Sequence, residues 1–513
     1  MKRLTLTGLM LAACGLTACA GVSVHSDAET AAWWRTTADL SSDAMEGRDI
    51  GSPGHARAVA YISDRFRAAG LQPAGDNGTF LQTIPLHEVA VPSEGTALSV
   101  VRRSGGAWPL RFLHDITVTP TDDLPAALDG ELVFRGYCSA ADMQAVQGRI
   151  VVCFGARRTG TPSGSERLAA ATAAGAIALI NVDDPGFDIE PPRWPVAYAR
   201  SVGFANAAPG PARIPVMRLS AGVFDDVIDG AGQDADAILT AGSRSAPLPS
   251  FDIPARLQAR FSIRKRDYSS DNVLGVLPGT DPTLADQPVL VDAHLDGYGY
   301  GEPVNGDSLY NGALDDAAYV ATLIQLADRQ AGRGFRRPVI FAAFTGEEKG
   351  LLGSRWLADH PTPRAPLPVA VINLDQLRPL YPLTILTTMA LDDSTLGQTV
   401  RDIAGPMGIE VRPDLEPERG LLRRSDHWPF MQKGVPAVSF IFGYDPGTEA
   451  ERRYREWYTT RYHLPQDDMT TPIDHEAAGA FNRFFFTLTE RVANADAPPQ
   501  WLPDSPYRPR NAD

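Results

Sequence analysis

The sequence predicts an α/β protein in which a mixed, mostly parallel sheet carries helices on both faces and is interrupted by a β-rich insertion. Three apolar runs after Pro249 lack the alternation of half-exposed strands: 288–296, 338–348 and 368–375. A segment with helical periodicity, 310–330, separates the first two runs. From about Val91 to Leu248, short strands instead alternate with loops rich in glycine and proline.

Length and charge exclude some functions. The chain has 513 residues, which suits several domains, and an apolar content that allows large cores. Its formal net charge is −15, from 62 acidic and 47 basic residues, and it has no long run of lysine or arginine. We therefore expect no nucleic-acid partner.

The first residues are typical of an export signal. Lys2 and Arg3 precede an apolar run, 4–16, that is too short to span a membrane. The run ends in LTAC (16–19), which resembles a bacterial lipoprotein processing site. The resemblance implies removal of residues 1–18 and a lipid on Cys19. The chain would then be anchored in the bacterial cell envelope, at the outer membrane facing the periplasm, because Ala20 follows the cysteine. The alternative is a plain secretory signal with a chance cysteine.

Two cysteines remain beyond the signal and its processing site. They are Cys138 and Cys153, since Cys14 lies within the signal. Paired cysteines in an exported protein predict a disulfide. Two separate buried thiols are the alternative.

The chain divides into four parts after the signal. Residues 19–90 begin the main α/β domain, 91–250 form the insertion, 251–496 complete the main domain, and 497–513 are a proline-rich tail expected to lie extended over the surface. In the first part, Ser52 and Pro53 begin a helix as N-cap and first-turn proline. That helix is expected to end at Gly70.

The insertion has its own pattern. Short strands are expected at 131–134, 149–154 and 176–181, with a helix at 166–174. The stretches GRIVVCFGARRTG and ERLAAATAAGAIALINVDD resemble the protease-associated (PA) domain, a small β-rich module. Any other small α/β insertion is the alternative.

Acids and a histidine follow the three apolar runs where each strand ends. The first run reaches His294, the second Glu347 and Glu348, and the third Asp375. Because the carboxyl ends of parallel strands meet at one edge of a sheet, we expect these side chains to lie together.

Two further residues are expected at the same edge. Asp315 stands at the start of the helical segment, and His463 follows the apolar run 435–442. Taken singly, each has a structural explanation as a helix cap or a loop histidine. Together, histidines and carboxylates without cysteine predict a site for a divalent ion such as zinc, with a carboxylate able to bridge two ions.

Six motifs occur along this part of the chain: AHLD, YNGALDDAA, FTGEEKGLLGS, NLD, SDHWPFMQKGVPAV and YHLPQD. Their order and spacing resemble the co-catalytic di-zinc exopeptidases, a family that includes bacterial leucyl aminopeptidases, aminopeptidase Y, glutamate carboxypeptidase and the inactive transferrin receptor. Residues 40–80 resemble the family's N-terminal stretch, so the likeness covers nearly all of the mature chain.

The resemblance implies two zinc ions per chain and five metal ligands: His294, Asp315, Glu348, Asp375 and His463. Asp315 would bridge the ions, with His294 and Asp375 on one of them. Glu348 and His463 would bind the other. The resemblance also implies a cis peptide bond between Asp315 and Asp316.

The remaining roles also follow from the resemblance. Glu347 would be the general base for a water shared by the zinc ions, and Tyr462 would donate a hydrogen bond to the developing oxyanion. Asp296 would orient the imidazole of the first zinc site. Asp426 and His427 would line the pocket without binding metal. Leu314 and Tyr319 depart from the family's pattern, at positions that are not ligands.

The resemblance implies a zinc exopeptidase that removes N-terminal residues from peptide substrates. A carboxypeptidase or dipeptidase of the same family is the main alternative, because Arg419 and Arg423 offer cations for a substrate's terminal carboxylate. A glutaminyl cyclase or a non-enzymatic receptor-like protein fits less well. The segment 444–461 is interpreted either as a lid over the site or as a solvated loop.

Overall fold

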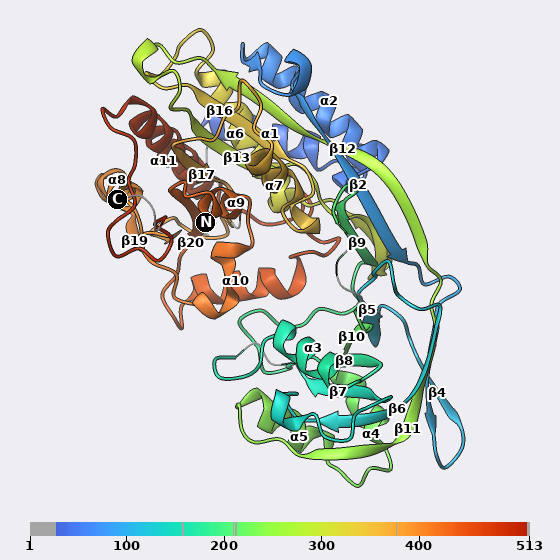
Figure 1. Ribbon diagram of the computed structural model, residues 1–513. Helices are drawn as coiled ribbons and strands as arrows, with labels where there is room; N and C mark the ends of the chain where they lie inside the picture. Colours follow the sequence, from blue (N-terminus) through green and yellow to red (C-terminus); the bar gives the residue numbers. More distant parts are fainter. Residues whose placement is uncertain (1–26, 156–157, 209, 211–212, 376, 510–513) are drawn as a thin grey trace, which may run out of the picture.

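The computed structural model describes residues 27–155, 158–208, 210, 213–375 and 377–509. The expected signal peptide and Cys19 lie outside these residues. None of the helices in the described part is long and apolar enough to cross a membrane. Figure 1 shows a larger upper body and a smaller lower body, connected along the right by the long strands β2 and β12.

The larger body is built on one mixed sheet, which has ten strands among the described residues. In sheet order nine of them are β19 (Glu410–Arg412), β18 (Ile385–Met389), β20 (Ala437–Phe442), β17 (Ala370–Asn373), β13 (Val289–His294), β16 (Val339–Phe344), β12 (Arg264–Leu277), β2 (Leu81–Val91) and β9 (Ala199–Phe204), and β1 (Gln72–Pro73) also pairs with β12. The four strands from β20 to β16 are parallel to one another. The outer pairs are antiparallel except β18 with β19.

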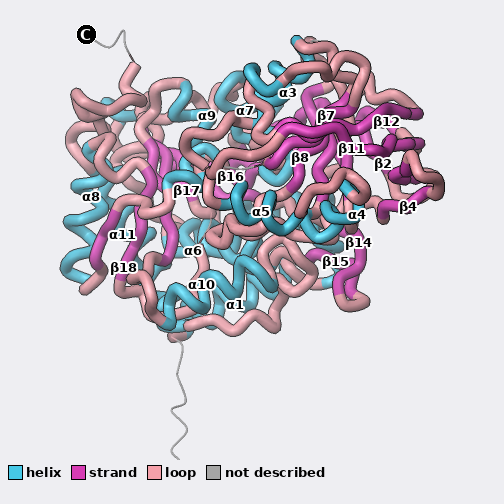
Figure 2. Tube along the Cα trace, turned by 90° about the horizontal axis from the view of Figure 1, so that it is seen from below, coloured by secondary structure: helices cyan, strands magenta, loops and turns pink. Residues whose placement is uncertain are grey.

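Helices cover both faces of this sheet, as the sequence predicts. One layer holds α1 (Ala28–Leu40), α2 (Pro53–Ala68), α6 (Ala318–Arg329), α8 (Thr395–Ala404) and α11 (His475–Asn494), and the other holds α7 (Leu352–Asp359) and α9 (His427–Gln432). Figure 2 shows these layers on opposite sides of β16 and β17. Val289 and Val291 lie in one core while Leu290 lies in the other. Burial on both faces explains why the runs do not alternate.

Local capping fixes where helices begin. The Ser52 side chain accepts a hydrogen bond from the His55 backbone, and Pro53 occupies the first turn of α2, as predicted. The segment 444–461 contains the helix α10 (Glu449–Thr460), which buries Tyr454, Trp457 and Tyr458 against the core, so the interpretation as a solvated loop is wrong.

The smaller body is a second sheet, of eight strands within the described part of the chain. Its order is β4 (Ala107–Leu110), β3 (Ala97–Arg102), β11 (Ser250–Arg260), β6 (Ala127–Arg135), β7 (Ile150–Phe154), β8 (Ala178–Val182), β10 (Val216–Leu219) and β5 (Ile116–Val118). The helices α3 (Gly164–Ala173), α4 (Phe224–Ile228) and α5 (Ala235–Ser243) accompany it. This sheet has a separate hydrophobic core.

The boundaries of the insertion differ from the expected 91–250. Strand β11 pairs with β3 and β6, so the second sheet continues to Arg260. Its inward residues Ile253, Ala255 and Leu257 belong to the second core, which is why the strand stays there. Conversely, β9 lies within the expected range of the insertion but pairs with β2 and belongs to the larger sheet.

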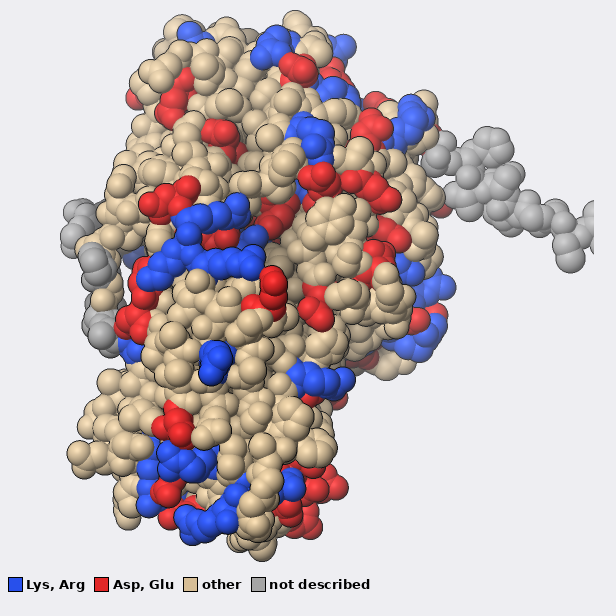
Figure 3. All heavy atoms as spheres, turned by 90° about the vertical axis from the view of Figure 1, so that its right-hand side faces the viewer, with Lys and Arg blue, Asp and Glu red and all other residues tan. Residues whose placement is uncertain are grey.

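The C-terminal segment lies along the larger body. Trp501 donates from its indole nitrogen to the Gly434 carbonyl at 2.7 Å and forms a bridge with Ser394. The ring of Tyr507 packs edge-on against Trp428, with centroids 5.9 Å apart. On the face at the right of Figure 1, Figure 3 shows acidic and basic side chains interspersed rather than separated into large areas of one sign.

A disulfide joins Cys138 and Cys153. Cys153 lies in β7, and Cys138 follows the neighbouring parallel strand β6. Both side chains are fully buried in a small cluster with Val133, Val151 and Leu179. The bond therefore closes a loop between adjacent strands of the second sheet.

Replacing both cysteines (Cys138→Ala with Cys153→Ala) should lower the free energy of unfolding of the second sheet by about 3 kcal/mol, because the unfolded chain regains the freedom of a closed loop. Urea denaturation followed by circular dichroism measures this change. Wild-type protein kept in reductant is the control and should unfold at the same urea concentration as the variant. Coincident curves for the variant and the oxidised wild type would contradict the prediction.

Candidate metal centre

Two groups of side chains at the carboxyl ends of the central strands have metal-ligand geometry. Ligand atoms of His294, Asp315 and Asp375 lie within 4.8 Å of one another, and so do those of Asp315, Glu348 and His463. We call these the first and second triads. Asp315 belongs to both, so the two triads adjoin. They contain all five residues that the sequence predicts as ligands.

The sheet brings these residues together. His294 is the last residue of β13, and it stands opposite Phe344, the last residue of β16, in the parallel register. Asp375 follows β17 on the other side of β13. Glu348 comes four residues after Phe344, in a short turn of helix. Adjacent strands that end together therefore supply three of the ligands.

The other two ligands approach from outside the sheet. Asp315 precedes α6, and its peptide bond to Asp316 is cis. His463 follows α10. His294 Nε2 lies 3.3 Å from Asp315 Oδ1, whereas His463 Nε2 lies 3.2 Å from Asp315 Oδ2. Asp315 thus presents a different oxygen to each imidazole, which is the arrangement of a bridging carboxylate.

The donor set fits divalent cations. Glu348 Oε1 is buried and accepts no hydrogen bond from the described residues, although His463 Nε2 lies 3.4 Å away. Desolvation, together with the charge of Asp315, raises the pKa of Glu348 to about 8. Desolvation lowers the pKa of His463 to about 4, which leaves a neutral imidazole. Neutral imidazoles and crowded carboxylates are ligands that a borderline ion such as zinc accepts, and a cation would relieve the repulsion.

Glu347 is placed differently from its neighbour. It belongs to neither triad, but with Glu348 and Asp315 it lines a cavity of about 570 Å³. Desolvation and the nearby charge of Asp375 raise the pKa of Glu347 well above its usual range. The adjacent acids therefore have separate positions, one in a triad and one at the cavity wall.

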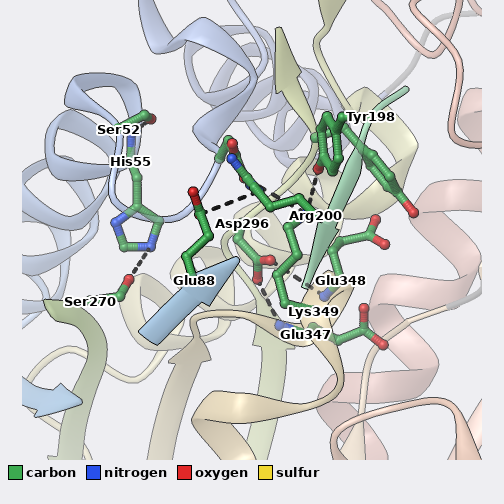
Figure 4. A network of polar contacts seen from close by, with 12 residues as sticks. Ser52, His55, Glu88, Tyr198, Arg200, Ser270, Asp296, Glu347, Glu348 and Lys349 are labelled. Atoms are coloured by element: carbon green, nitrogen blue, oxygen red, sulfur yellow. Dashed lines mark hydrogen bonds and ion pairs between the residues drawn. The ribbon is translucent and has the colours of Figure 1, made fainter. Parts of the chain in front are cut away.

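Asp296 contacts the imidazole less directly than expected. His294 Nδ1 lies 3.2 Å from the backbone carbonyl oxygen of Asp296 and 3.8 Å from its carboxylate. The carboxylate instead accepts the backbone N–H groups of Glu347 at 3.1 Å and of Glu348 at 3.4 Å. Figure 4 shows the Asp296 carboxylate beside this turn, with both hydrogen bonds drawn. Its side chain therefore fixes the turn that carries both glutamates.

The expectation that Asp426 and His427 line the pocket is wrong. Both are fully buried, and neither is among the described residues that line the cavity. Ser354 donates to the Asp426 carboxylate, and His427 Nδ1 lies 3.2 Å from the side-chain oxygen of Asn373. They start α9, which packs against α7 behind the site, so they support the walls rather than face the substrate space.

Tyr462 lines the same cavity, and only 2% of it is exposed. Its ring lies against that of His463, with centroids 3.7 Å apart. Burial raises the pKa of Tyr462 well above its usual range. Its hydroxyl therefore keeps the proton that a hydrogen-bond donor needs.

Two residues that hold Asp315 were not singled out from the sequence. Asp467 accepts the backbone N–H groups of Leu314 and Asp315, each at 3.0 Å. Arg378 is fully buried, with Nη2 3.6 Å from Asp315 Oδ2. Asp467 is the last residue of the motif YHLPQD, so the sequence could have indicated its place near the site. No local spacing distinguishes Arg378 from other arginines.

The region between β8 and β9 supplies neighbours of the second triad that no motif indicated. The guanidinium of Arg193 lies 4.6 Å from the ring centre of Tyr462 and, through Nη2, 3.5 Å from His463 Nδ1. Glu190 pairs with Arg424 through both oxygens, at 2.7 and 3.0 Å. The insertion therefore reaches the metal centre directly.

A second set of contacts connects the insertion to the turn Glu347–Lys349, as Figure 4 shows. Lys349 donates to the hydroxyl of Tyr198, and its Nζ lies 4.9 Å from the centre of that ring. Arg200, in β9, pairs with Asp49 and lies 3.4 Å from Glu88 of β2. Lys349, the residue after Glu348, is thus anchored next to β9, which pairs with β2 of the larger sheet.

Because Asp315 belongs to both triads, Asp315→Asn should remove metal from both, whereas Asp375→Asn should weaken only the first triad. We expect close to zero bound divalent ions per chain for Asp315→Asn after dialysis, measured by elemental analysis. Asp468→Asn, which changes a carboxylate outside both triads, is the control. Full metal content in Asp315→Asn would refute the shared-ligand geometry.

Comparisons with known proteins agree with this site. Residues 272–489 match Peptidase family M28. A probable glutamate carboxypeptidase of Zea mays is 25% identical over 79% of this chain and 60% of its own length. Leupeptin-inactivating enzyme 1 of Streptomyces exfoliatus is 25% identical over 55% of this chain and 62% of its own length. The chain thus spans about three fifths of the length of these curated relatives.

The fold also matches solved structures. An aminopeptidase from Aneurinibacillus sp. strain AM-1 superimposes with a TM-score of 0.60 at 19% identity, over 91% of this chain and 95% of its own. The likeness extends over nearly the whole chain and confirms the α/β class. The matched segment 272–489 includes every ligand of both triads. Residues 272–489 of this chain, which hold both triads, therefore resemble peptidase family M28.

Proposed function

We propose that this protein is a zinc-dependent exopeptidase that removes N-terminal residues from peptides, with two zinc ions held by the two triads. The main support is that Asp315 presents one carboxylate oxygen to each imidazole. Glu347 lines the cavity beside them. Names of similar proteins support the metal and the reaction: one is a probable zinc metalloprotease of Pyrenophora tritici-repentis, and another is a zinc aminopeptidase from Bacillus subtilis.

The triads and the cavity wall have separate roles in the proposed reaction. Bound divalent ions would polarise the scissile carbonyl and lower the pKa of water at the site. Glu347 is the acid that remains free to move a proton, because it lines the cavity but belongs to neither triad. It takes the proton of the attacking water onto its carboxylate and passes it to the leaving amine.

Asp296 and Tyr462 position and complete this step. The two backbone hydrogen bonds to the Asp296 carboxylate hold the turn of Glu347, so the base cannot swing away with the backbone. Tyr462 lines the cavity and donates its hydroxyl proton in a hydrogen bond to the oxygen on which negative charge develops.

The arginines near the site favour the free-amine substrate. Arg424 is paired with Glu190 through both oxygens, and Arg419 is 6% exposed and donates to Tyr454 at 2.8 Å. Neither is available to bind a terminal carboxylate. Arg423 is exposed, lines the cavity and lies 5.3 Å from the ring centre of Trp428. A carboxypeptidase or dipeptidase activity therefore remains the second candidate, resting on Arg423.

We also propose that the chain is exported and anchored through a lipid on Cys19. The support is the sequence pattern of residues 2–19, together with the disulfide between Cys138 and Cys153. Such bonds persist in oxidising compartments.

Glu347→Gln should abolish hydrolysis while leaving the metal content unchanged, because the variant loses the base but no ligand. We expect kcat to fall by about 10²- to 10⁴-fold. Glu348→Gln is the matched comparison at the adjacent position and should lose metal from the second triad. A Glu347→Gln enzyme within tenfold of wild type would eliminate Glu347 as the base.

A panel of blocked and free peptides tests the direction of cleavage. Leucyl p-nitroanilide should be hydrolysed, and an N-acylated dipeptide should not, because the carboxylates of the site accept a cationic amine. Cleavage of the blocked peptide alone would replace the aminopeptidase with the carboxypeptidase. In that case Arg423→Gln should abolish the cleavage, since it removes the exposed cation at the cavity.

A further inference from the structure

The two triads have the same types of ligand but different surroundings. Each combines one histidine, one carboxylate of its own and the shared Asp315. The side chain of His463 is 17% exposed, whereas that of His294 is 1% exposed. A difference in metal affinity must therefore arise from what lies around the ligands and not from the ligands themselves.

The outer nitrogens of the two imidazoles face opposite kinds of partner. His294 Nδ1 faces the oxygens of Asp296, the carbonyl at 3.2 Å and the carboxylate at 3.8 Å. His463 Nδ1 faces the hydroxyl of Tyr298 at 2.9 Å and the guanidinium of Arg193 at 3.5 Å. The first imidazole has a neutral carbonyl as its hydrogen-bond acceptor with a carboxylate just beyond it, and the second has one neutral partner and one cation.

These partners change how well each imidazole binds a cation. When Nε2 binds metal, Nδ1 carries the proton and donates it to its outer partner. An anionic acceptor makes the ring a stronger ligand, while a phenol mainly fixes its orientation. A guanidinium on the far side of the ring adds repulsion toward any cation at Nε2.

Tyr298 is held firmly in place. Its ring lies 4.6 Å from that of His463, 5.7 Å from Tyr198 and 6.1 Å from Tyr310, all between centroids. The Lys349 ammonium lies 4.7 Å from the Tyr298 ring centre. The phenol can therefore fix the direction of the His463 ring.

Arg193 comes from the insertion. It lies between β8 and β9, its guanidinium stacks on Tyr462, and its backbone carbonyl accepts from Arg218 at 3.3 Å. It also lines a smaller cavity of about 210 Å³ that reaches Tyr298 and His463. Its charge is thus fixed beside the second triad by Tyr462 of the main domain and by Arg218 of the insertion.

We propose that these outer partners make the metal sites unequal, so that the second triad is the weaker, more readily exchanged site, in which Tyr298 positions His463 and Arg193 of the insertion lowers the affinity. The proposal rests on the proposed function, because it requires two bound ions. It assigns to the insertion a role in setting how fully the centre is loaded with metal.

Titration of metal-free protein with Zn²⁺ against a competing chelator tests this proposal. The wild type should bind two ions in separate steps that differ more than tenfold in affinity. Asp375→Asn should delete the tight step and Glu348→Gln the weak one, which assigns each step to a triad. Fewer than two ions in the wild type would overturn the proposed function itself. Two equal steps would overturn only the inequality.

Tyr298→Phe tests the positioning residue. It removes the hydroxyl but keeps the ring, so the weak step should weaken further by about 10- to 100-fold while the tight step is unchanged. Tyr310→Phe is the matched control: its hydroxyl donates to the Glu302 carbonyl at 2.8 Å and faces neither triad. An unchanged weak step, or equal weakening of both steps in a folded variant, would refute the role of Tyr298.

Arg193→Gln tests the charge from the insertion in the opposite direction. Removing the cation should strengthen the weak step by about tenfold or more, which corresponds to at least about 1.4 kcal/mol. Arg193→Lys keeps a cation and should stay near the wild type. A weak step that is unchanged or weaker in Arg193→Gln would contradict the proposed repulsion.

Discussion

Four carboxylates occupy one small volume where β13, β16 and β17 end, and much of the molecule serves to hold them there. Asp315, Glu347, Glu348 and Asp375 would repel one another in any low-dielectric site, and desolvation adds to the cost. The strands that carry them are buried on both faces and give them little freedom to separate. The fixed positive charge of Arg378 offsets part of the repulsion, and the Nε2 atom of each imidazole lies against Asp315. Divalent ions would offset the remainder, so metal binding and the stability of this edge are coupled.

Much of this centre could be predicted from sequence because its signals are local. Strands buried on both faces lack alternation, and a ligand at the end of each such strand must lie at the same edge. The residues around the ligands carry no such signal. Tyr298 and Arg378 follow the ligands His294 and Asp375 by four and three residues, but no spacing singles them out, and Arg193 reaches the site from the insertion.

Two expectations differed from the structure for physical reasons. Asp426 and His427 stand in a strong motif, but their helix packs behind the site, so their polarity serves internal hydrogen bonds. The boundary at 250 followed a change in composition, whereas β11 remains in the second sheet because its alternate residues complete that core. A change of composition therefore marked the insertion only to within one strand.

The connection between the two bodies has a mechanical consequence. Residues 92–96 and 261–263 connect the two sheets where the chain first enters and finally leaves the second sheet, and β2, β9 and β12 form a continuous hydrogen-bonded ribbon. To swing the insertion away from the metal centre, the chain must bend this three-stranded ribbon instead of turning on a loose linker. The opening above the metal centre is therefore expected to keep its width. Under the proposed function, an opening of fixed width would admit extended peptide ends and exclude folded chains by their size.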